Sequence, residues 1–339
     1  MKTEFLTMEN LGKAIDALRQ GEIVAFPTET VYGLGADATN TRACQKIFEA
    51  KGRPADNPLI IHVLDLSGLE RLIRGPLPET ARILAETFWP GPVTVVLPAN
   101  DTIPLAVRGG MPTVAIRVPS DEIARSLIEG LGRPIAAPSA NRSGRPSPTR
   151  ALDVWHDLRG QIPYIIDGGE SLVGLESTIV DCSLDEPVLL RPGFVGLETL
   201  ESVLKRKVLL PGANTPHKAP GMKYTHYAPH APVIWINMKE DHLIEEALRK
   251  LDHEYHRNIA LLAPLKWQNY CAKFFLALGD NVETVAHGLF SGFRELDRHN
   301  PDAIVVIWDE NDSGVGLAIA NRLGKASLKQ FGRVRQVRE

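Results

Sequence analysis

Short apolar runs alternate with amphipathic stretches along most of the chain. Leu11, Ala14, Ile15 and Leu18 recur at the spacing of one helix face, and the apolar run that follows has strand length. The same alternation continues to residue 205. It predicts strands at 22–26, 59–63, 93–97, 113–118, 164–167, 177–181 and 188–190 and helices at 40–52, 79–89, 121–129 and 198–205. Strands that alternate with helices predict an α/β fold with a mostly parallel sheet covered on both faces.

Residues 211–232 interrupt this pattern with five prolines and two glycines, which disfavour any long regular element. Beyond them the alternation resumes, with strands predicted at 233–236, 258–263, 274–278 and 303–308 and helices at 240–252, 282–298 and 314–324. We therefore expect a larger N-terminal domain over residues 1–210, a linker over 211–232 and a C-terminal α/β domain over 233–339. The basic tail from Lys329 onward is expected to be frayed.

Composition narrows the class of protein. Of the 339 residues, 44% are hydrophobic and 23% are charged, and the net charge is -3, which excludes a disordered chain and a histone-like basic binder. Cys44, Cys182 and Cys271 are too few and too scattered for a disulfide framework, so a reduced, cytosolic location is expected. No apolar run reaches membrane-spanning length, and the first ten residues predict no signal peptide.

Familiar nucleotide-binding motifs are missing from the sequence. The chain contains no G-x-x-x-x-G-K-[ST], which excludes a P-loop. Residues 314–320, GVGLAIA, contain G-x-G without a third glycine or a strand directly before it, so they are read as a helix start rather than a dinucleotide site. Any nucleotide site must be built from other loops.

Three loops concentrate polar side chains and are the candidates for such a site. Residues 27–35, PTETVYGLG, and 51–58, KGRPADNP, each follow a predicted element, and residues 138–149 hold four hydroxyls, an amide and two arginines between prolines. Backbone N–H groups, hydroxyls and an Arg fork suit phosphate binding. Each loop also has a purely structural alternative. Residues 27–35 could form an ST-turn, residues 51–58 could be a helix C-terminus whose cations interact with the helix dipole, and residues 138–149 could be a surface linker.

Charged residues inside apolar strands add to these loops. Arg117 lies between Ile116 and Val118 and must point to the opposite face, so it lines a site or reaches solvent. Arg191 lies at the end of another predicted strand. Together with Arg117, Lys51 and Arg53 it would provide four cations for one polyanion. The other histidines lack metal-ligand spacing, whereas the histidine at position 62 lies beside the second polar loop.

Six segments in this order resemble the YrdC/Sua5 family, the threonylcarbamoyl-AMP synthases. They are PTETVYGLG (27–35), KGRPADNPLIIH (51–62), TVAIRVP (113–119), APSANRSGRPSPT (137–149), ESTIVD (176–181) and RPG (191–193). APGMKYTHYAP (219–229) and GVGLAIANRLGKAS (314–327) resemble the linker and C-terminal domain of the long, two-domain Sua5 type. The resemblance implies an N-terminal twisted mixed sheet with helices and a smaller Rossmann-like C-terminal α/β domain. Ala219 departs from the family, which usually has Ser there.

The activity that the resemblance implies is the condensation of L-threonine, bicarbonate and ATP, assisted by Mg²⁺, to threonylcarbamoyl-AMP and pyrophosphate. The product would serve N6-threonylcarbamoylation of adenosine 37 in tRNAs that read ANN codons, through partner transfer proteins. Such chemistry needs positioning and charge neutralisation rather than a nucleophilic side chain. The alternative is an RNA-binding or regulatory module without catalysis; a weak tRNA contact is compatible with either. Carbamoyl transfer, as in larger relatives, would need cysteine-rich domains.

The resemblance also implies roles for individual residues. The expected threonine contacts are Thr30, His62, Arg117, Ala137 and Ser177. The expected ATP contacts are Lys51, Arg53, Asn57, Thr113, Ser139, Asn141, Ser147, Arg191, Tyr224 and Tyr227. Lys51 and Arg53 are expected to be catalytic, the two tyrosines are expected to fold over the nucleotide as a lid, and no metal bound by protein side chains is expected.

Overall fold

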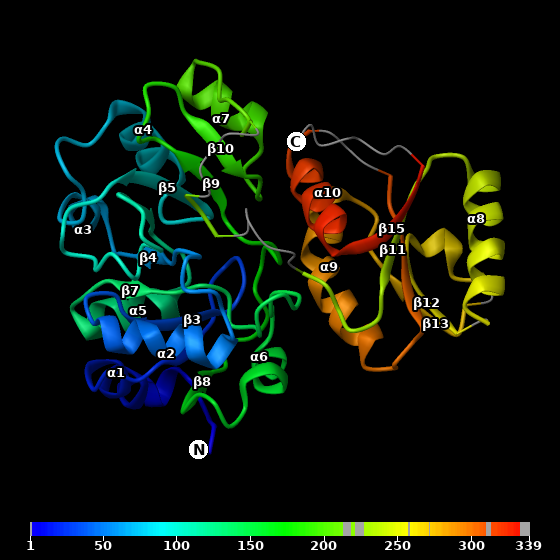
Figure 1. The fold of residues 1–339 in the computed structure, drawn as a ribbon, viewed down its shortest axis with the longest axis horizontal. Helices are drawn as coiled ribbons and strands as arrows, with labels where there is room; N and C mark the ends of the chain where they lie inside the picture. The colour runs from blue at the N-terminus through cyan, green and yellow to red at the C-terminus, as the bar shows by residue number, and fades with distance from the viewer. Residues whose placement is uncertain are drawn as a thin grey trace.

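The chain folds around two separate β-sheets, one of ten strands and one of five (Figure 1). The structure is a computed structural model that describes residues 2–212, 218–220, 227–256, 258–270, 272–309 and 313–332. Both sheets carry helices, so the α/β class predicted from the sequence is confirmed.

The ten-stranded sheet belongs to the N-terminal part of the chain. Its strands are β1 (Glu4–Leu6), β2 (Val24–Phe26), β3 (Gly33–Asp37), β4 (Ile60–His62), β5 (Val93–Pro98), β6 (Thr113–Arg117), β7 (Ile135–Ala136), β8 (Tyr164–Ile166), β9 (Thr178–Asp181) and β10 (Val188–Arg191). Their spatial order is β1-β8-β2-β3-β7-β4-β6-β5-β9-β10. The helices of this part are η1 (Met8–Asn10), α1 (Leu11–Arg19), α2 (Thr41–Lys51), α3 (Leu66–Glu70), α4 (Glu79–Phe88), α5 (Glu122–Leu131), α6 (Ala151–Leu158) and α7 (Leu197–Leu204).

This sheet is mixed, as the resemblance implies, and the mostly parallel sheet predicted from the alternation alone is wrong here. The strands β2 and β3 pair antiparallel, as do β3 with β7 and β7 with β4. The physical reason is the short connection after β2, because a few residues can reverse the chain but cannot form a crossover to a parallel strand. Part of the polar loop 27–35 therefore becomes strand β3.

The two faces of the ten-stranded sheet are covered differently. Helices α2, α4, α6 and α7 pack one face around a large apolar cluster, and α1 and α5 pack the other face near β1, β2 and β8. Over β4, β6, β5 and β9 that second face carries only a small cluster around Ile60, Ala115 and Ile179. Since side chains alternate along a strand, His62 and Arg117 lie on this less covered face.

The C-terminal domain is a parallel sheet between helices. Its strands, in the order β13-β12-β14-β11-β15, all pair in parallel. They are β11 (Val233–Asn237), β12 (Ile259–Ala263), β13 (Phe274–Ala277), β14 (Ala303–Ile307) and β15 (Ser327–Gly332), and the helices are α8 (Asp241–Glu254), η2 (Leu265–Trp267), α9 (Val282–Asp297) and α10 (Val315–Ala326). The predicted fraying from Lys329 onward is wrong as far as Gly332, because β15 pairs with β11; residues 333–339 lie outside the described part.

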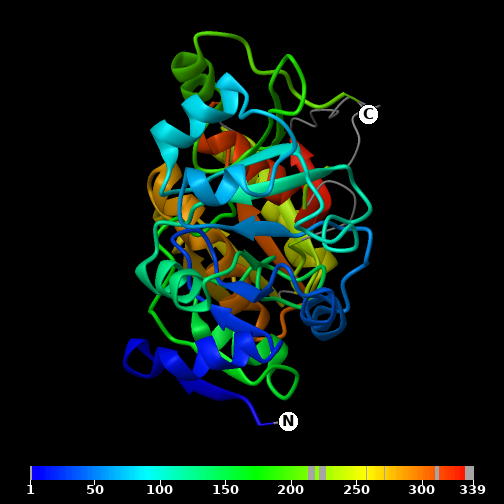
Figure 2. The ribbon, with the colours of Figure 1, turned by 90° about the vertical axis from the view of Figure 1, so that its left-hand side faces the viewer.

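Helices α9 and α10 lie between the smaller sheet and the N-terminal domain, while α8 covers the far face (Figure 1). Seen from the side of the N-terminal domain, the C-terminal domain lies behind the larger sheet (Figure 2). Val31 and Leu175 of the N-terminal domain share one buried cluster with residues of α9 and α10. The two domains are therefore joined by a continuous apolar interface.

Within the described ranges no helix combines the length and apolar character that a membrane crossing requires. Cys44 and Cys182 are buried free thiols, and burial raises the pKa of the Cys44 thiol to about 12. Cys271 lies outside the described residues.

Candidate functional site

A cavity opens on the less covered face of the ten-stranded sheet. Its walls come from the loop after β2, the end of α2, strands β4 and β6, the segment 137–147, the segment around Glu176 and the linker. Segments far apart in the sequence, including the three polar loops predicted to carry chemistry, therefore meet at one place.

Lys51 is the last residue of α2, and its ammonium group organises the third polar loop. Gly52 takes the left-handed conformation with φ 60°, which ends the helix and leaves Lys51 pointing into the cavity wall. The Nζ of Lys51 donates to the carbonyls of Ser139 and Asn141. The side chain is only 3% exposed, and its burial, together with the charge of Arg53, lowers the pKa of Lys51 well below its ordinary value.

The segment 139–145 is folded tightly by its own side chains. The hydroxyl of Ser139 donates to Oδ1 of Asn141, and Nδ2 of Asn141 donates to the carbonyls of Arg142 and Arg145 at 2.7 and 2.9 Å. The interpretation of this segment as a flexible surface linker is therefore not supported. Its geometry is fixed around the ammonium group of Lys51 before any ligand binds.

Arg117 forms the opposite side of the cavity. Its Nε donates to the carbonyl of Gly91 at 3.1 Å, and its Nη1 donates to the hydroxyl of Thr30 at 2.8 Å. Its Nη2 lies 2.6 Å from Oε1 of Glu29, a buried ion pair that the sequence analysis did not foresee. Of the two alternatives for Arg117, lining a site or reaching solvent, the structure shows the first.

His62 is the neighbour of Arg117 across the β4–β6 pair. It lines the cavity, is buried, and its Nδ1 has no hydrogen-bond partner among the described residues. Burial, reinforced by the charge of Arg117, lowers the pKa of His62 to about 3. The imidazole is therefore neutral at physiological pH and offers its ring nitrogens for hydrogen bonding rather than as a cation.

Arg191 and Ser177 close the next part of the wall. The guanidinium of Arg191 donates from Nε and Nη2 to the carbonyl of Ser177, at 3.1 and 3.0 Å. The hydroxyl of Ser177 lies 2.7 Å from that of Thr94. Burial lowers the pKa of Arg191, although Tyr227 and Glu176 oppose that shift. A guanidinium group stays protonated in proteins, so Arg191 brings a fixed positive charge to the cavity.

Glu176 links the cavity to the C-terminal domain. Nη2 and Nε of Arg322, on α10, donate to Oε2 of Glu176 at 3.0 and 3.1 Å, and the hydroxyl of Ser147 donates to Oε1. Arg322 is 0% exposed, and its guanidinium lies 5.6 Å from the ring centre of Tyr227. Burial alone would raise the pKa of Glu176, but the charges of Arg322 and Arg191 lower it. Glu176 is therefore held as a carboxylate.

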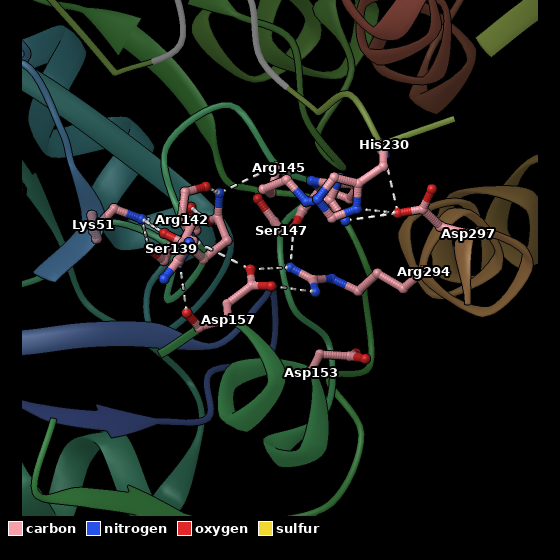
Figure 3. Close-up of polar contacts among 12 residues, drawn as sticks. Lys51, Ser139, Arg142, Arg145, Ser147, Asp153, Asp157, His230, Arg294 and Asp297 are labelled. Carbon is pink, nitrogen blue, oxygen red and sulfur yellow. Dashed lines mark hydrogen bonds and ion pairs between the residues drawn. The ribbon is translucent and has the colours of Figure 1, made fainter. Parts of the chain in front are cut away.

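A second group of contacts, from helices α6 and α9, holds the outer side of the third polar loop, residues 138–149 (Figure 3). Arg294 of α9 lies 2.8 Å from Oδ2 of Asp157 on α6 and donates to the carbonyl of Pro146. Asp297 of α9 pairs with Arg145 at 2.7 Å. The C-terminal domain thus supports the polar loop from behind, while Lys51 holds its inner side (Figure 3).

Most of the residues predicted for the site line this cavity. They are Thr30, Lys51, Arg53, His62, Arg117, Ala137, Ser139, Asn141, Ser147, Ser177, Arg191 and Tyr227. Asn57 and Thr113 are buried nearby but do not line it. Tyr224 lies outside the described residues, so its predicted contact remains a prediction.

Several lining residues received no role from the sequence, namely Thr28, Val31, Tyr32, Ile60, Arg145, Glu176 and Pro220. Glu176 and Arg145 lie in polar segments that the sequence analysis names, so the sequence indicates their segments but not the side chains that they contact. The buried charge of Arg322 had a visible signal too, because an Arg on the apolar face of a helix between Ala318 and Ala326 needs a partner.

The chemistry of this cavity favours a polyanion beside a small polar ligand. Lys51, Arg53, Arg145 and Arg191 supply positive charge along one side, and His62, Ser177 and Thr30 supply neutral polar atoms near Arg117. Among the described residues no group of three or more His, Cys, Asp or Glu side chains could hold a metal ion.

Comparisons with known proteins identify the family of this chain. The Sua5_yciO_yrdC family model, described as "Telomere recombination", matches residues 16–193, and a model for the C-terminal domain of threonylcarbamoyl-AMP synthase matches residues 195–327. A protein of Pyrococcus abyssi named threonylcarbamoyl-AMP synthase is 48% identical, over 91% of this chain and 92% of its own. A protein of Bacillus subtilis with the same name is 46% identical, over 94% and 92%.

The crystal structure of P. abyssi Sua5 complexed with L-threonine superposes with a TM-score of 0.91 and 44% identity, covering 97% of this chain and 100% of the other. The same family is indicated by the two family models, by the relatives matched over nearly their whole length and by the shared two-domain structure. The chain belongs to the YrdC/Sua5 family of threonylcarbamoyl-AMP synthases, in its long two-domain form.

Proposed function

We propose that this protein is an ATP-dependent L-threonylcarbamoyladenylate synthase. The observation that carries the proposal is the convergence of the predicted threonine and ATP residues on one cavity, in a chain whose relatives are named threonylcarbamoyl-AMP synthase. The substrates are L-threonine, bicarbonate and MgATP, the products are threonylcarbamoyl-AMP and pyrophosphate, and the enzyme class is nucleotidyltransferase.

The proposed reaction has two bond-forming steps. Bicarbonate takes up a proton and loses water to give CO₂. The neutral threonine amine attacks the carbon of CO₂ and releases a proton to solvent, which gives a carbamate. A carbamate oxygen then attacks the α-phosphorus of ATP, the bond from that phosphorus to the bridging oxygen breaks, and pyrophosphate leaves. Because carbamates are short-lived in water, a closed site between loop and linker suits the intermediate.

In the threonine subsite, we assign the amino-acid carboxylate to Arg117. The free Nδ1 of His62 and the hydroxyls of Thr30 and Ser177 are assigned to its polar groups, with Ala137 against its side chain. L-Threonine as the ligand is supported by the related P. abyssi Sua5, which was crystallised with L-threonine. The neutral His62 can accept or donate a hydrogen bond without adding charge.

In the nucleotide subsite, Lys51 and Arg53 neutralise the triphosphate and the charge that develops on the leaving pyrophosphate. Ser139, Asn141, Ser147 and Arg191 are assigned as further nucleotide contacts. Mg²⁺ enters bound to the phosphates of ATP and is part of the substrate. Asn57 and Thr113 have polar atoms without partners among the described residues, so they stay proposed contacts that would need a small movement.

Tyr227 is proposed to close the cavity from the linker side. Its ring is buried, stacks on Phe290 of α9 with 5.2 Å between ring centres, and lines the cavity. The same face of the linker would cover ATP as a lid. The downstream use of the product, in tRNA modification by partner proteins in the cytosol, is part of the proposal.

The proposed function is tested by measuring pyrophosphate release from ATP by the full-length protein. We expect release to fall at least about tenfold when either L-threonine or bicarbonate is omitted. Release that does not depend on threonine would contradict the proposal. RNA binding without threonine-dependent release would favour the alternative, a binding module of the same fold.

A first mutational prediction concerns Arg117→Ala. The KM for threonine is expected to rise at least about 100-fold with the KM for ATP within about threefold, because a buried charge-assisted bond to the carboxylate is lost. The melting temperature should also fall, since Glu29 is left buried without its partner. Steady-state kinetics in both substrates, with a thermal melt, check this. Equal rises in both KM values would contradict the assignment of Arg117.

A further inference from the structure

The guanidinium of Arg117 is already paired inside the protein before any ligand arrives. Oε1 of Glu29 lies 2.6 Å from Nη2 of Arg117, and the two side chains are 7% and 4% exposed. Oε2 of Glu29 accepts the backbone N–H of Ser120 at 3.2 Å, which fixes the carboxylate from its other side. Both partners are thus held in place, and their charges cancel within the buried site.

The other polar side chains assigned to the threonine subsite carry no charge. His62 is neutral, and Thr30 and Ser177 contribute hydroxyls. Asp121 lies near Glu29, but its Oδ1 accepts the N–H of Ala124 at the start of α5. Lys51, in contrast, donates to carbonyl oxygens that carry no full charge. Arg191 borders the subsite, because its Nη2 donates to the hydroxyl of Ser177 at 3.1 Å, and it interacts electrostatically with the carboxylate of Glu176.

We propose that Glu29 is a specificity-determining residue that balances the charge of Arg117, so that the subsite selects a zwitterionic amino acid over a simple carboxylate or inorganic anion. The inference rests on the proposed function and deepens it. Glu29 does not line the cavity, so it acts through Arg117 and through its field rather than by contact with substrate.

The need for such a residue follows from the substrates themselves. Bicarbonate, ATP and pyrophosphate are all anions and share this cavity with the amino acid. An uncompensated guanidinium in a poorly solvated site would attract any of them, because the interaction of unit charges is strengthened where water is excluded. With Glu29 present, a monoanion brings an unbalanced charge, whereas threonine brings one positive and one negative group.

The experiment measures binding of two ligands by calorimetry, without ATP or bicarbonate, to the full-length protein. L-Threonine is compared with 3-hydroxybutyrate, which keeps the carboxylate and hydroxyl but lacks the amine. Glu29→Gln keeps the length of the side chain and an oxygen beside Arg117, while the negative charge is gone. We expect the ratio of the Kd for 3-hydroxybutyrate to the Kd for threonine to fall at least about tenfold relative to wild type.

Two further variants separate charge from structure. Glu29→Asp keeps the charge and should keep a ratio within about threefold of wild type, even if both ligands bind more weakly. Glu22→Gln removes an acid from the same domain, where Glu22 pairs with Lys46 away from the cavity, and should match wild type. An unchanged ratio in Glu29→Gln, or an equal fall in Glu29→Asp, would overturn the proposal.

The results for wild type and for the variants also distinguish a failure of this inference from a failure of the proposed function. If wild type fails to bind threonine, the proposed function is at fault and not the role of Glu29. If wild type binds threonine and rejects 3-hydroxybutyrate equally in all variants, the proposed function stands and the role of Glu29 is wrong. Should Glu29→Gln fold poorly, Ser120→Pro, which removes the N–H that Oε2 accepts, shifts the carboxylate and should lower the ratio in the same direction.

Discussion

Lys51→Met is expected to lower the kcat for threonine-dependent pyrophosphate release by about 100- to 1,000-fold, the range seen when one preorganised electrostatic group is removed from an active site. Lys51 is buried at the end of α2, where its ammonium group joins the loop carbonyls of Ser139 and Asn141 to the proposed phosphate site. Methionine keeps most of the apolar stem and removes the ammonium group, with its charge and its N–H donors. Single-turnover kinetics at saturating MgATP and threonine measure the effect.

A matched control is available on the same helix. Lys46→Met removes an exposed lysine of α2 that pairs with Glu22, and it should leave kcat within about twofold of wild type. Lys51→Met also leaves two carbonyls without their donor, which costs about 1–3 kcal/mol of stability. A thermal melt lowered as severely as turnover would show that Lys51 serves only the end of the helix.

Arg322→Met is expected to damage both folding stability and activity, although Arg322 belongs to the C-terminal domain. The substitution leaves the carboxylate of Glu176 buried without its cation, which costs about 3–5 kcal/mol. It also frees the carbonyl of Pro192, which accepts from Nη1 of Arg322 at 2.6 Å, and removes the cation beside Tyr227. We expect kcat/KM for ATP to fall at least about tenfold.

A double variant, Arg322→Met with Glu176→Gln, tests whether the unpaired carboxylate causes the loss of stability. Adding that substitution to Arg322→Met removes the stranded charge, so denaturant unfolding should regain more than half of the lost stability. Arg249→Met, on the exposed face of α8, is the matched control and should match wild type in both measurements. Stability that is not regained in the double variant would mean that the Glu176–Arg322 charge pair is not what joins the domains here.

Much of the candidate site could be predicted because its polar side chains lie in local segments of the sequence. Lys51 and Arg53 flank the glycine that ends a helix, and the position of Arg117 in an apolar strand dictates its face. Periodicity likewise located the long helices, whose buried positions recur every three to four residues. The short pieces β1 and α3 were missed, since three to five residues give too little periodicity. Helix α6 was missed as well, although α7 has the same length and was predicted.

What the sequence could not show depends on contacts between distant segments. Glu29 and Arg117 are 88 positions apart, and Glu176 and Arg322 are 146 apart, so their pairing requires the folded sheet and the docked domain. The predicted frayed tail failed for the same reason. Residues 327–332 have little strand character of their own and become β15 because β11 offers an open edge.

We propose that Lys51, Arg53, Arg117 and Arg191 converge on one ATP molecule beside one amino acid. A crystal structure of this protein with L-threonine, Mg²⁺ and a non-hydrolysable ATP analogue tests this proposal. We expect the triphosphate within hydrogen-bonding distance of Lys51 and Arg53 and the amino-acid carboxylate on Arg117. Density for the nucleotide elsewhere on the molecule, with this cavity empty, would contradict it.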